Sequence, residues 1–521
     1  MCVMHIVFSI VVAAMLISCL HAQADEQKIY HIIYPDKVII NKHTHHITFI
    51  ISSPKSLKQS LILPSNIKLK FSEKGFIDIA NGYTLTINGE ILSEQKKIFA
   101  GRGNVIINPI TTVRVYPSWF GVENGKLDSE NRFQSFLNTL SMSGAQGIIP
   151  AGFMVSSDYN LYMFGSATLF CNSRRTSILR VDGDLSTRDD AVELYWLNLG
   201  ITAKSGREIP WRGYIKNCTF TATPYANFSY PVMIHSADGF SIEHNVFDWR
   251  GQKNTTLPVA SVEGFNNYKW CKTCLTRRNG SISHNTVLAK QDEIGGEGLG
   301  INTAEHITFD NNYVYGVGDD PIAVHGSKNI RITNNQLFST DGRIIFDNSN
   351  DIHIEGNYME RIAGGHSKAY YSGGAYIYGS GEMIGLPAPS NITIKNNLLK
   401  IPKTLKSSTY AIRVIGVKKS WIADNTIVND SANQKTLGIS IEAGYYPQRK
   451  GQNDFESGRI MQTGNIHVLN NRCIGQYPMG IGMTGDLENL IGPFVFSGNL
   501  AKKYQVYAPN SRLDESNKKN D

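Results

Sequence analysis

Hydrophobic and polar residues alternate in one short pattern that recurs through the second half of the chain. Each copy has two apolar residues separated by one position, a short polar step, an Asn and a further apolar pair. Examples are "FSIEHNVF", "ITFDNNYV", "IRITNNQL" and "ITIKNNLL". Alternation with a period of two is typical of β-strands whose two faces meet different surroundings. The pattern therefore predicts two short strands that meet at an Asn corner.

The Asn positions recur at intervals that define one turn of a repeating structure. They are Asn245, Asn285, Asn312, Asn335, Asn357, Asn397, Asn425, Asn471 and Asn499, with Cys218 in the same place one step earlier. The intervals run from 22 to 46 residues, and the three longest indicate turns lengthened by loops. Such self-similarity is typical of a solenoid, and the apolar positions are the β-favouring Ile, Val and Phe. We therefore predict an all-β fold, a right-handed parallel β-helix whose corner Asn side chains form a ladder.

The region before the repeats has a different texture. Residues 66–110 contain short alternating runs punctuated by Gly and Asn-Gly, which indicate strands of an opening cap. Farther on, Phe133, Phe136, Leu137 and Leu140 follow helical spacing, with Asp128 or Ser129 available as N-cap. We predict an N-terminal cap with a short helix and the first coils over residues 25–155, a β-helix over 156–505, and a polar tail over 506–521.

The first 24 residues have the features of a signal peptide. An apolar run from Ile6 to Leu20 precedes the small-x-small site Ala22-Gln23-Ala24, so the mature protein is expected to begin near Asp25. A second interpretation takes "LISC" as a lipobox that would leave a lipid anchor on Cys19, and we favour simple cleavage. No later apolar run reaches the ~20 residues that a membrane-spanning helix needs. The expected location is periplasmic or secreted.

The net charge and the cysteine content say little about partners, disulfides or metal sites. The net charge of +7 is compatible with an acidic partner such as a uronic-acid polysaccharide, and nothing beyond charge favours nucleic acid. The mature chain keeps an odd number of cysteines, which argues against a disulfide framework, and the lone "CKTC" lacks the second pair of a zinc site. A disulfide between Cys271 and Cys274 stays open. We expect neither a metal nor a cofactor.

The register of the repeat brings acidic residues together. Counting back from the isoleucines that start each closing strand places Leu299, Ile322 and Ile344 in one core column, and Ile301, Val324 and Phe346 in another. Just before these columns lie four acidic residues on three successive coils: Glu297, Asp319, Asp320 and Asp341. Stacked strands lie ~4.8 Å apart, so these carboxyl groups would share one patch. Crowded carboxylates do not all ionise together, which favours a general acid beside a general base. These four residues are the predicted catalytic groups.

The same aspartates have a structural alternative, since Asp at a β-helix corner often accepts backbone N–H groups. Around them we expect five substrate-binding side chains: His325, Lys328, Arg343, Tyr376 and Tyr378. His325 is expected to point outward beside Asn302 and Asp347, while the two tyrosines offer rings that suit sugars.

Two segments resemble known families. The series "TLTINGEI", "VYPSWFG" and "IIPAG" resembles the N-terminal part of the tailspike-like and pectin-lyase-like β-helix superfamily, whose members act on polysaccharides. The stretch "GVGDDPIAVHGSKNIRITNN" resembles the polygalacturonase family of glycoside hydrolases, which implies Asp319 and Asp320 as acid and base with Glu297 assisting. The His-Gly of that family is here "DGR" at Asp341 to Arg343, and its Arg-Ile-Lys motif is absent. Polygalacturonase activity itself is therefore not expected.

The combined expectation is an exported bacterial protein that cleaves or processes an acidic extracellular polysaccharide by carboxylate acid/base chemistry, as a glycoside hydrolase does. Two alternatives stay open. One is a uronate polysaccharide lyase, and the other is a periplasmic β-helix protein of exopolysaccharide biosynthesis without hydrolase activity.

Overall fold

The computed structural model describes nineteen stretches of the chain, which we take as the described residues. They are 28–31, 47–183, 195–202, 208–226, 230–251, 277–289, 297–318, 320–339, 342–362, 375–381, 388–403, 409–431, 437–449, 455–475, 480–485, 487–501, 503–505, 511–513 and 518–519. The predicted signal peptide, Cys271, Cys274, Asp319 and Asp341 lie outside them. Contacts within the chain define two compact units, Met1–Leu179 and Arg180–Asp521. Each unit is described by itself.

The first unit begins with three small parallel sheets. Their strands are β1 (Lys28–His31), β2 (Ile47–Ile51), β5 (Ile67–Phe71) and β8 (Ile91–Leu92); β3 (Lys55–Leu57), β6 (Ile77–Ile79) and β9 (Phe99–Gly101); and β4 (Leu61–Leu63), β7 (Thr84–Ile87) and β10 (Asn104–Ile107). Buried and exposed positions alternate along β5 and β6, as the period-two pattern predicts. The unit continues through β11 (Arg114–Val115), the 3-10 helix η2 (Pro117–Phe120), β12 (Leu127–Asp128), β13 (Gln146–Ile149), β14 (Met154–Ser157), β15 (Leu161–Met163), β16 (Thr168–Cys171) and the start of β17 (Ile178–Val181).

The predicted helix is present as α1 (Arg132–Ser143). Its apolar stripe is buried, with Phe133, Phe136, Leu137 and Leu140 at most 1% exposed. The residue at the N-cap position is Asn131, which makes no side-chain cap. Asp128 nevertheless accepts the N–H groups of Arg132 and Phe133, so this residue satisfies the first turn from three positions farther back.

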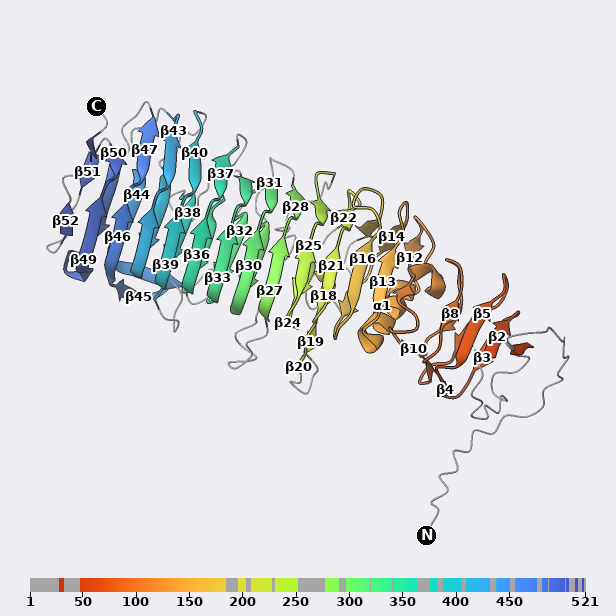
Figure 1. Ribbon diagram of the computed structural model, residues 1–521. Coiled ribbons are helices and arrows are strands. Elements are labelled where there is room, and N and C mark those ends of the chain that lie inside the picture. The colour runs from red at the N-terminus through yellow and green to blue at the C-terminus, as the bar shows by residue number, and fades with distance from the viewer. Residues whose placement is uncertain are drawn as a thin grey trace, which may run out of the picture. The chain divides into compact units, whose positions relative to one another are not determined.

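The second unit consists mainly of three stacked parallel sheets, which we call sheets A, B and C. In Figure 1 the strands of sheet B lie side by side from β27 to β49. Sheet A contains β29 (Leu299–Asn302), β32 (Ile322–His325), β35 (Ile344–Asp347), β38 (Ile377–Ser380), β41 (Tyr410–Ile415), β44 (Leu437–Arg449), β48 (Gly480–Gly485) and β51 (Lys503–Gln505). Within this unit sheet B contains β21 (Tyr214–Lys216), β25 (Ser241–Glu243), β27 (Arg277–Ser283), β30 (Ala304–Asp310), β33 (Lys328–Thr333), β36 (Asn350–Glu355), β39 (Ser390–Lys395), β42 (Lys418–Ala423), β46 (Thr463–Leu469), β49 (Leu490–Ser497) and β52 (Ser511–Leu513).

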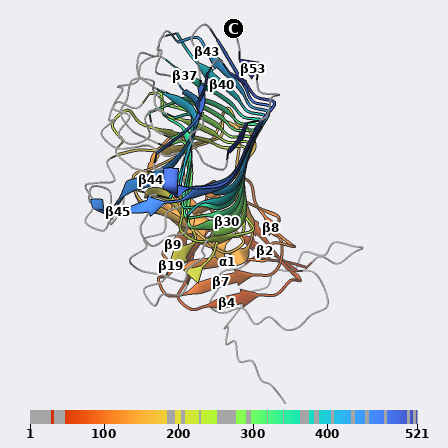
Figure 2. The same ribbon diagram turned by 90° about the vertical axis from the view of Figure 1, so that its left-hand side faces the viewer.

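Sheet C completes each coil. It contains β22 (Thr219–Ala222), β26 (Val246–Asp248), β28 (Thr286–Leu288), β31 (Tyr313–Val317), β34 (Gln336–Ser339), β37 (Tyr358–Arg361), β40 (Leu398–Ile401), β43 (Thr426–Asn429), β47 (Arg472–Gly475), β50 (Leu500–Ala501) and β53 (Lys518–Lys519). The strands β52 and β53 fall in the segment predicted as a polar tail, where they pair with β49 and β50. Outside the stack of sheet A, β44 pairs antiparallel with β45 (Phe455–Met461), as Figure 2 shows.

The remaining elements of the second unit are short. They are β18 (Tyr195–Leu199) paired with β23 (Tyr230–Ile234), β19 (Ile201–Thr202) paired with β20 (Glu208–Ile209), β24 (Ala237–Asp238) beside β27, and the 3-10 helix η4 (Leu487–Asn489). None of the described helices combines the length and the hydrophobicity needed to cross a bilayer. Cys473 is a free, buried thiol.

The predicted core register is confirmed. Leu299, Ile322 and Ile344 pair with one another on successive strands of sheet A, as do Ile301, Val324 and Phe346. All six side chains are fully buried. Because side chains alternate along a strand, the residues between and beside these columns point to the outer face of the sheet.

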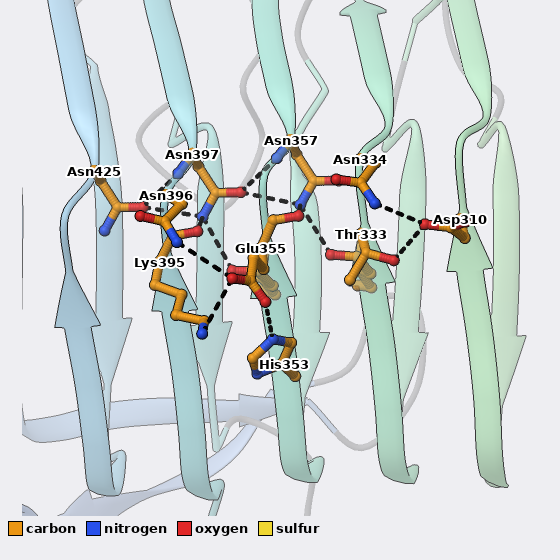
Figure 3. Close-up of polar contacts among 12 residues, drawn as sticks. Asp310, Thr333, Asn334, His353, Glu355, Asn357, Lys395, Asn396, Asn397 and Asn425 are labelled. Atoms are coloured by element: carbon orange, nitrogen blue, oxygen red, sulfur yellow. Dashed lines mark hydrogen bonds and ion pairs between the residues drawn. The ribbon is translucent and has the colours of Figure 1, made fainter.

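The Asn ladder forms at the corner between sheets B and C. The backbone N–H and the side-chain amide of Asn357 both donate to Oδ1 of Asn397 on the next coil, at 2.9 and 3.0 Å. The same pair of bonds continues from Asn397 to Asn425 (Figure 3). Cys218 also uses its backbone N–H to donate to Asn245, so the position inferred for it is correct. The ladder fixes the phase of one coil against the next.

The unusual backbone at this corner belongs to a neighbour of the ladder residue. The residue before each ladder position has a positive φ, as in Asn334 (57°), Asn396 (55°) and Gly356 (68°), whereas the ladder asparagines do not. Asn and Gly occupy the left-handed region most easily, so this preceding residue makes the bend. The ladder Asn is then free to point inward and satisfy buried main-chain groups.

Candidate functional site

The candidate site lies on the outer face of sheet A, where strands β29, β32 and β35 present the same positions on three coils. Asn302, His325 and Asp347 pair in register at the ends of these strands. The predicted outward placement of His325 beside Asn302 and Asp347 is confirmed. Gly300, Ala323 and Ile345 form the adjacent outward column. Ala323 and Ile345 are buried in an apolar cluster with Tyr378, Ile415 and Met461, so His325 lies at the border of a covered part of this face.

Two serines, Ser327 and Ser349, follow His325 and Asp347 at the corner of each coil and hydrogen-bond to the ends of these strands. Ser327 accepts the N–H of Ala304 on the preceding coil at 3.0 Å and donates to the carbonyl oxygen of His325 at 2.9 Å. Ser349 repeats the arrangement, since it accepts the N–H of Ser327 and donates to the carbonyl oxygen of Asp347. Both serines are buried. The backbones that carry the two titratable side chains are therefore tied to each other.

His325 forms an ion pair with Asp347. Its Nδ1 lies 3.4 Å from Oδ2 of Asp347, and the side chains are 17% and 11% exposed. The other oxygen of Asp347 accepts the hydroxyl of Ser380 at 2.8 Å. Burial by itself lowers the pKa of His325, but the hydrogen bond and charge of Asp347, with the charges of Glu297 and Asp320, outweigh it, so the pKa is raised above 6.5. The surroundings favour a protonated imidazole.

Asp320 is a buried carboxylate held by Arg343. The guanidinium Nε lies 3.1 Å from Oδ1 of Asp320, and the backbone N–H of Arg343 donates to the same oxygen at 3.3 Å. The Asp320 side chain is 5% exposed and that of Arg343 is 15% exposed. Removing an ion pair of this kind from water is tolerated because each charge compensates the other. These contacts agree with the structural role considered for the aspartates in the sequence analysis, in which the carboxylate accepts a backbone N–H group.

Glu297 stands one coil before Asp320. The N–H of Gly298 donates to the carbonyl oxygen of Asp320 at 2.9 Å, and the N–H of Leu299 donates to that of Pro321 at 3.0 Å. These bonds place Glu297 at the same point on its coil as Asp320, and its side chain is partly exposed. The structure therefore brings together Glu297, Asp320 and His325.

The other predicted site residues have different surroundings. Asp319 and Asp341 lie outside the described residues. Lys328 begins β33 and is exposed on sheet B, in register with Glu305 and Asn350, so it lies on a different sheet from His325.

Tyr376 and Tyr378 are only 1% and 2% exposed. The hydroxyl of Tyr376 donates to the carbonyl oxygen of Lys400 at 2.9 Å, and its ring lies 4.9 Å from the guanidinium of Arg361. The ring of Tyr378 lies 5.5 Å from the guanidinium of Arg343 and 5.8 Å from that of Arg413. Cations stack favourably on such rings. Both tyrosine rings are therefore buried against arginines. We no longer propose either ring as a surface on which a sugar stacks.

Sequence reasoning missed the charged pair that continues this face. Arg413 meets Glu442 with two hydrogen bonds of 2.8 Å, and Ser440 donates to the same carboxylate at 2.9 Å. Both residues occupy outward positions of β41 and β44, but loops of unequal length separate them along the chain. Only the strand register brings them together.

Within the described ranges, no group of three or more His, Cys, Asp and Glu side chains is arranged to hold a metal ion. The polar groups of the face form pairs: His325 with Asp347, Arg343 with Asp320, and Arg413 with Glu442. Such a face offers one titratable imidazole among fixed charges, an arrangement suited to proton transfer.

Comparison with known proteins identifies the fold. A family model described as a right handed beta helix region matches residues 260–427. No curated protein matches the chain. Among solved structures, the A-module of a mannuronan C-5 epimerase from Azotobacter vinelandii is 12% identical, with 77% of this chain and 98% of that chain covered and a TM-score of 0.42. The surface protein and adhesin PfbA of Streptococcus pneumoniae is 14% identical, with coverages of 78% and 98% and a TM-score of 0.41. The Dettilon tailspike protein is 10% identical, with coverages of 78% and 67% and a TM-score of 0.43.

The parallel strands, their coil-by-coil register and the internal ladder agree with the family match. Strands of sheets A, B and C follow one another in the same order along successive coils, and each coil pairs with the next. The fold of this chain is therefore a right-handed parallel β-helix, and residues 260–427 match the family model of that fold.

Proposed function

We propose that this protein processes an acidic extracellular polysaccharide by acid/base chemistry on the outer face of sheet A. The observation that carries the proposal is the position of His325, in register between Asn302 and Asp347 and within the field of Glu297 and Asp320. A histidine so placed can hold and release a proton, which acid/base chemistry requires.

Each group receives a role from its contacts. His325 carries the proton, and Asp347 orients the imidazole while Ser380 holds Asp347. Arg343 supplies positive charge at the same face, fixed there by Asp320. The basic net charge of the chain favours a polymer that carries carboxylates.

Hydrolysis is the reaction we place first. One carboxyl group would protonate the leaving oxygen, and a second would assist water or attack the sugar. Because Asp320 is held as a carboxylate by Arg343, Glu297 and Asp319 are the better candidates for exchanging protons, with Asp341 next to them in sequence register. The likeness of "GVGDDPIAVHGSKNIRITNN" to the polygalacturonase family implies Asp319 and Asp320 as acid and base with Glu297 assisting, so it supports Asp319 and differs from our assignment at Asp320.

A lyase reaction is the second candidate, and one observation favours it. A lyase needs a base that removes the proton beside a uronate carboxylate and a cation that neutralises that carboxylate. His325 and Arg343 share Asp320 as a charged neighbour, so a cation and an imidazole that acts as a base once it has lost its proton occur on the same face. In that reaction the polymer is cut with formation of a double bond.

We further propose that the chain reaches the periplasm or the exterior through cleavage of residues 1–24. N-terminal sequencing of protein from the periplasmic fraction and the medium tests this, and a start near Asp25 is expected. A lipid-modified Cys19 in the membrane fraction would contradict it.

The central test is a panel of acidic polysaccharides treated with the purified mature protein. New reducing ends report cleavage of any kind, and ultraviolet absorbance of unsaturated products reports a lyase. His325→Gln and the double change Asp319→Asn/Asp320→Asn are compared with wild type. His353→Gln is the matched control, because His353 also pairs with a carboxylate, Glu355, at 2.6 Å but on sheet B (Figure 3).

We expect the site variants to lose at least about a hundredfold in rate, the usual contribution of a positioned acid or base. The His353→Gln variant should keep wild-type activity. Cleavage that survives both site changes would exclude this site. A folded protein that cuts no polymer of the panel would favour the non-catalytic role in exopolysaccharide biosynthesis.

A further inference from the structure

We propose that the outer face of sheet B carries a second binding surface for acidic polysaccharide, built around Trp421 and separate from the candidate catalytic site. We call it the Trp421 platform, defined by Trp421, His467, Thr393, Lys418 and Lys419. The class of ligand rests on the proposed function, whereas the surface itself rests on the contacts described next.

Trp421 occupies an outward position of β42 and is 39% exposed. It pairs in register with Thr393 of β39 on one side and with His467 of β46 on the other. The indole and imidazole rings are stacked, with centroids 5.3 Å apart and planes inclined by only 10°. His467 therefore covers one face of the indole. Because Thr393 is short, it leaves the other face without an equally large neighbour.

The row in which Trp421 lies is otherwise polar. The in-register outward residues of the preceding strands are Thr308, Arg331, His353 and Thr393. A lone exposed apolar residue is common on protein surfaces and needs no explanation. A large aromatic ring backed by a parallel ring, within a polar row along stacked coils, is a more specific arrangement, because it presents a flat apolar surface bordered by hydrogen-bonding groups.

The charge around the indole complements an anionic polymer. Lys418 and Lys419 start the same strand and are both exposed. Among the described residues, no carboxylate lies within 4.0 Å of either ammonium group, whereas Lys395 on β39 is engaged by Glu355 at 3.0 Å. Two exposed lysines at the start of the strand that carries the exposed indole suit a sugar that has an apolar ring face and a carboxylate. A second protein copy would instead be expected to bury the ring against apolar groups.

The platform and the candidate catalytic site lie on different sheets and on different coils, because Trp421 is on β42 of sheet B and His325 is on β32 of sheet A. Strands β41 of sheet A and β42 of sheet B are consecutive in the chain, and they carry Arg413 and Trp421 respectively. A polymer held at sheet B is therefore not held at the groups around His325. We infer that the platform retains long chains, so its loss should weaken action on polymers and spare action on short oligosaccharides.

Binding is measured by affinity electrophoresis of the full mature protein in gels that contain each acidic polysaccharide, including polygalacturonate and alginate. Trp421→Ala is compared with Leu398→Ala, an apolar residue of sheet C that is 38% exposed and so loses a similar exposed fraction. Thermal unfolding of both variants confirms that each is folded. A third variant, Lys418→Gln/Lys419→Gln, tests the charge.

For at least one polymer we expect Trp421→Ala to raise the dissociation constant about tenfold, as loss of one aromatic stacking contact does, while Leu398→Ala leaves it unchanged. The double lysine change should weaken binding and reduce its dependence on salt. Equal retardation of Trp421→Ala and Leu398→Ala overturns the proposal, as does a wild-type protein that no polymer of the panel retards. Loss of a dimer in sedimentation of Trp421→Ala, with polymer binding intact, also overturns it in favour of self-association.

The proposed catalysis around His325 and the proposed Trp421 platform can each be wrong without the other, and the experiments distinguish the two cases. His325→Gln should keep full retardation, because His325 is not part of the platform. If the protein cleaves a polymer and Trp421→Ala does not change polymer binding, the platform is excluded and the proposed catalysis is not. Retardation that depends on Trp421, with no reaction on any polymer, leaves the platform in place and sinks the proposed catalysis.

Discussion

Asn335 donates twice to Oδ1 of Asn357 on the next coil, through its backbone N–H and its side-chain amide, each at 2.9 Å. Its own Oδ1 accepts the same two bonds from Asn312, and its amide also reaches the carbonyl oxygen of Phe309 at 3.1 Å. The side chain is fully buried. One residue thus links three successive coils, and its side chain satisfies the main-chain N–H of Asn312 and the carbonyl oxygen of Phe309 on the preceding coil.

Replacing Asn335 with Ala should destabilise the β-helix by about 3 kcal/mol, since it takes a hydrogen-bond partner from the buried N–H of Asn312 and the C=O of Phe309 on the preceding coil. The midpoint of chemical unfolding measures the change. The control is Asn334→Gly, at an exposed position whose positive φ of 57° glycine accepts readily. A shift for Asn335→Ala no larger than that for Asn334→Gly would show that the ladder adds little.

Removing one member of the Asp320–Arg343 pair should cost more than removing both. Arg343→Met leaves a carboxylate buried without its cation, for which about 3–5 kcal/mol is expected. The double change Asp320→Leu/Arg343→Met removes both charges and should recover most of that loss. Unfolding midpoints of wild type, Arg343→Met, Asp320→Leu and the double variant together form a double-mutant cycle that measures the coupling between the two side chains. A double variant less stable than Arg343→Met would contradict the compensated pair.

His325 should make folding depend on pH in a specific direction. Its pKa in the folded protein is raised above 6.5, chiefly through Asp347 once burial is outweighed. A group of this kind stabilises the folded state fully below its unfolded pKa and loses that contribution as the pH rises through the folded pKa. Wild type should therefore exceed His325→Gln in melting temperature more at about pH 5.5 than at about pH 9. An equal difference at both values would rule out the raised pKa.

Glu355 should act in the opposite direction. Its hydrogen bond from His353, with those from Lys395 and Asn396, lowers the pKa of its carboxyl group to about 2 (Figure 3). A lowered pKa stabilises the folded state above the unfolded pKa, and the contribution disappears as the pH falls toward 2. Glu355→Gln should therefore be less stable than wild type at neutral pH and match it near pH 2. Melting curves across that range measure the difference, and a gap that persists in acid would point to lost packing instead.

Sequence reasoning succeeded where a local rule is repeated. The ladder asparagines, the inward columns headed by Leu299 and Ile301, and the outward neighbours of His325 all follow from strand periodicity counted from one corner to the next. The helix α1 follows from the spacing of Phe133, Phe136, Leu137 and Leu140 in the same way. Because the pattern is repeated many times, an exception in one copy does not obscure it. The register of one coil against the next can therefore be predicted from the sequence without knowing any tertiary contact.

The partners of individual side chains could not be read in this way. The sequence shows that Asp320 and Arg343 stand at neighbouring points of adjacent coils, but not that the guanidinium would bury the carboxylate. It also predicted Tyr376 and Tyr378 as substrate-binding side chains, whereas their rings are buried against arginines. Glu442 escaped notice because loops of irregular length separate it from Arg413.

The order of apolar and polar residues by itself determined that this chain winds into a parallel β-helix with an Asn ladder, because alternation and corner geometry act within a few residues. The tertiary structure decided which charges are buried and which groups meet on the outer faces. Those outcomes depend on the desolvation of each group and on neighbours contributed by other coils, which no short segment of the sequence contains.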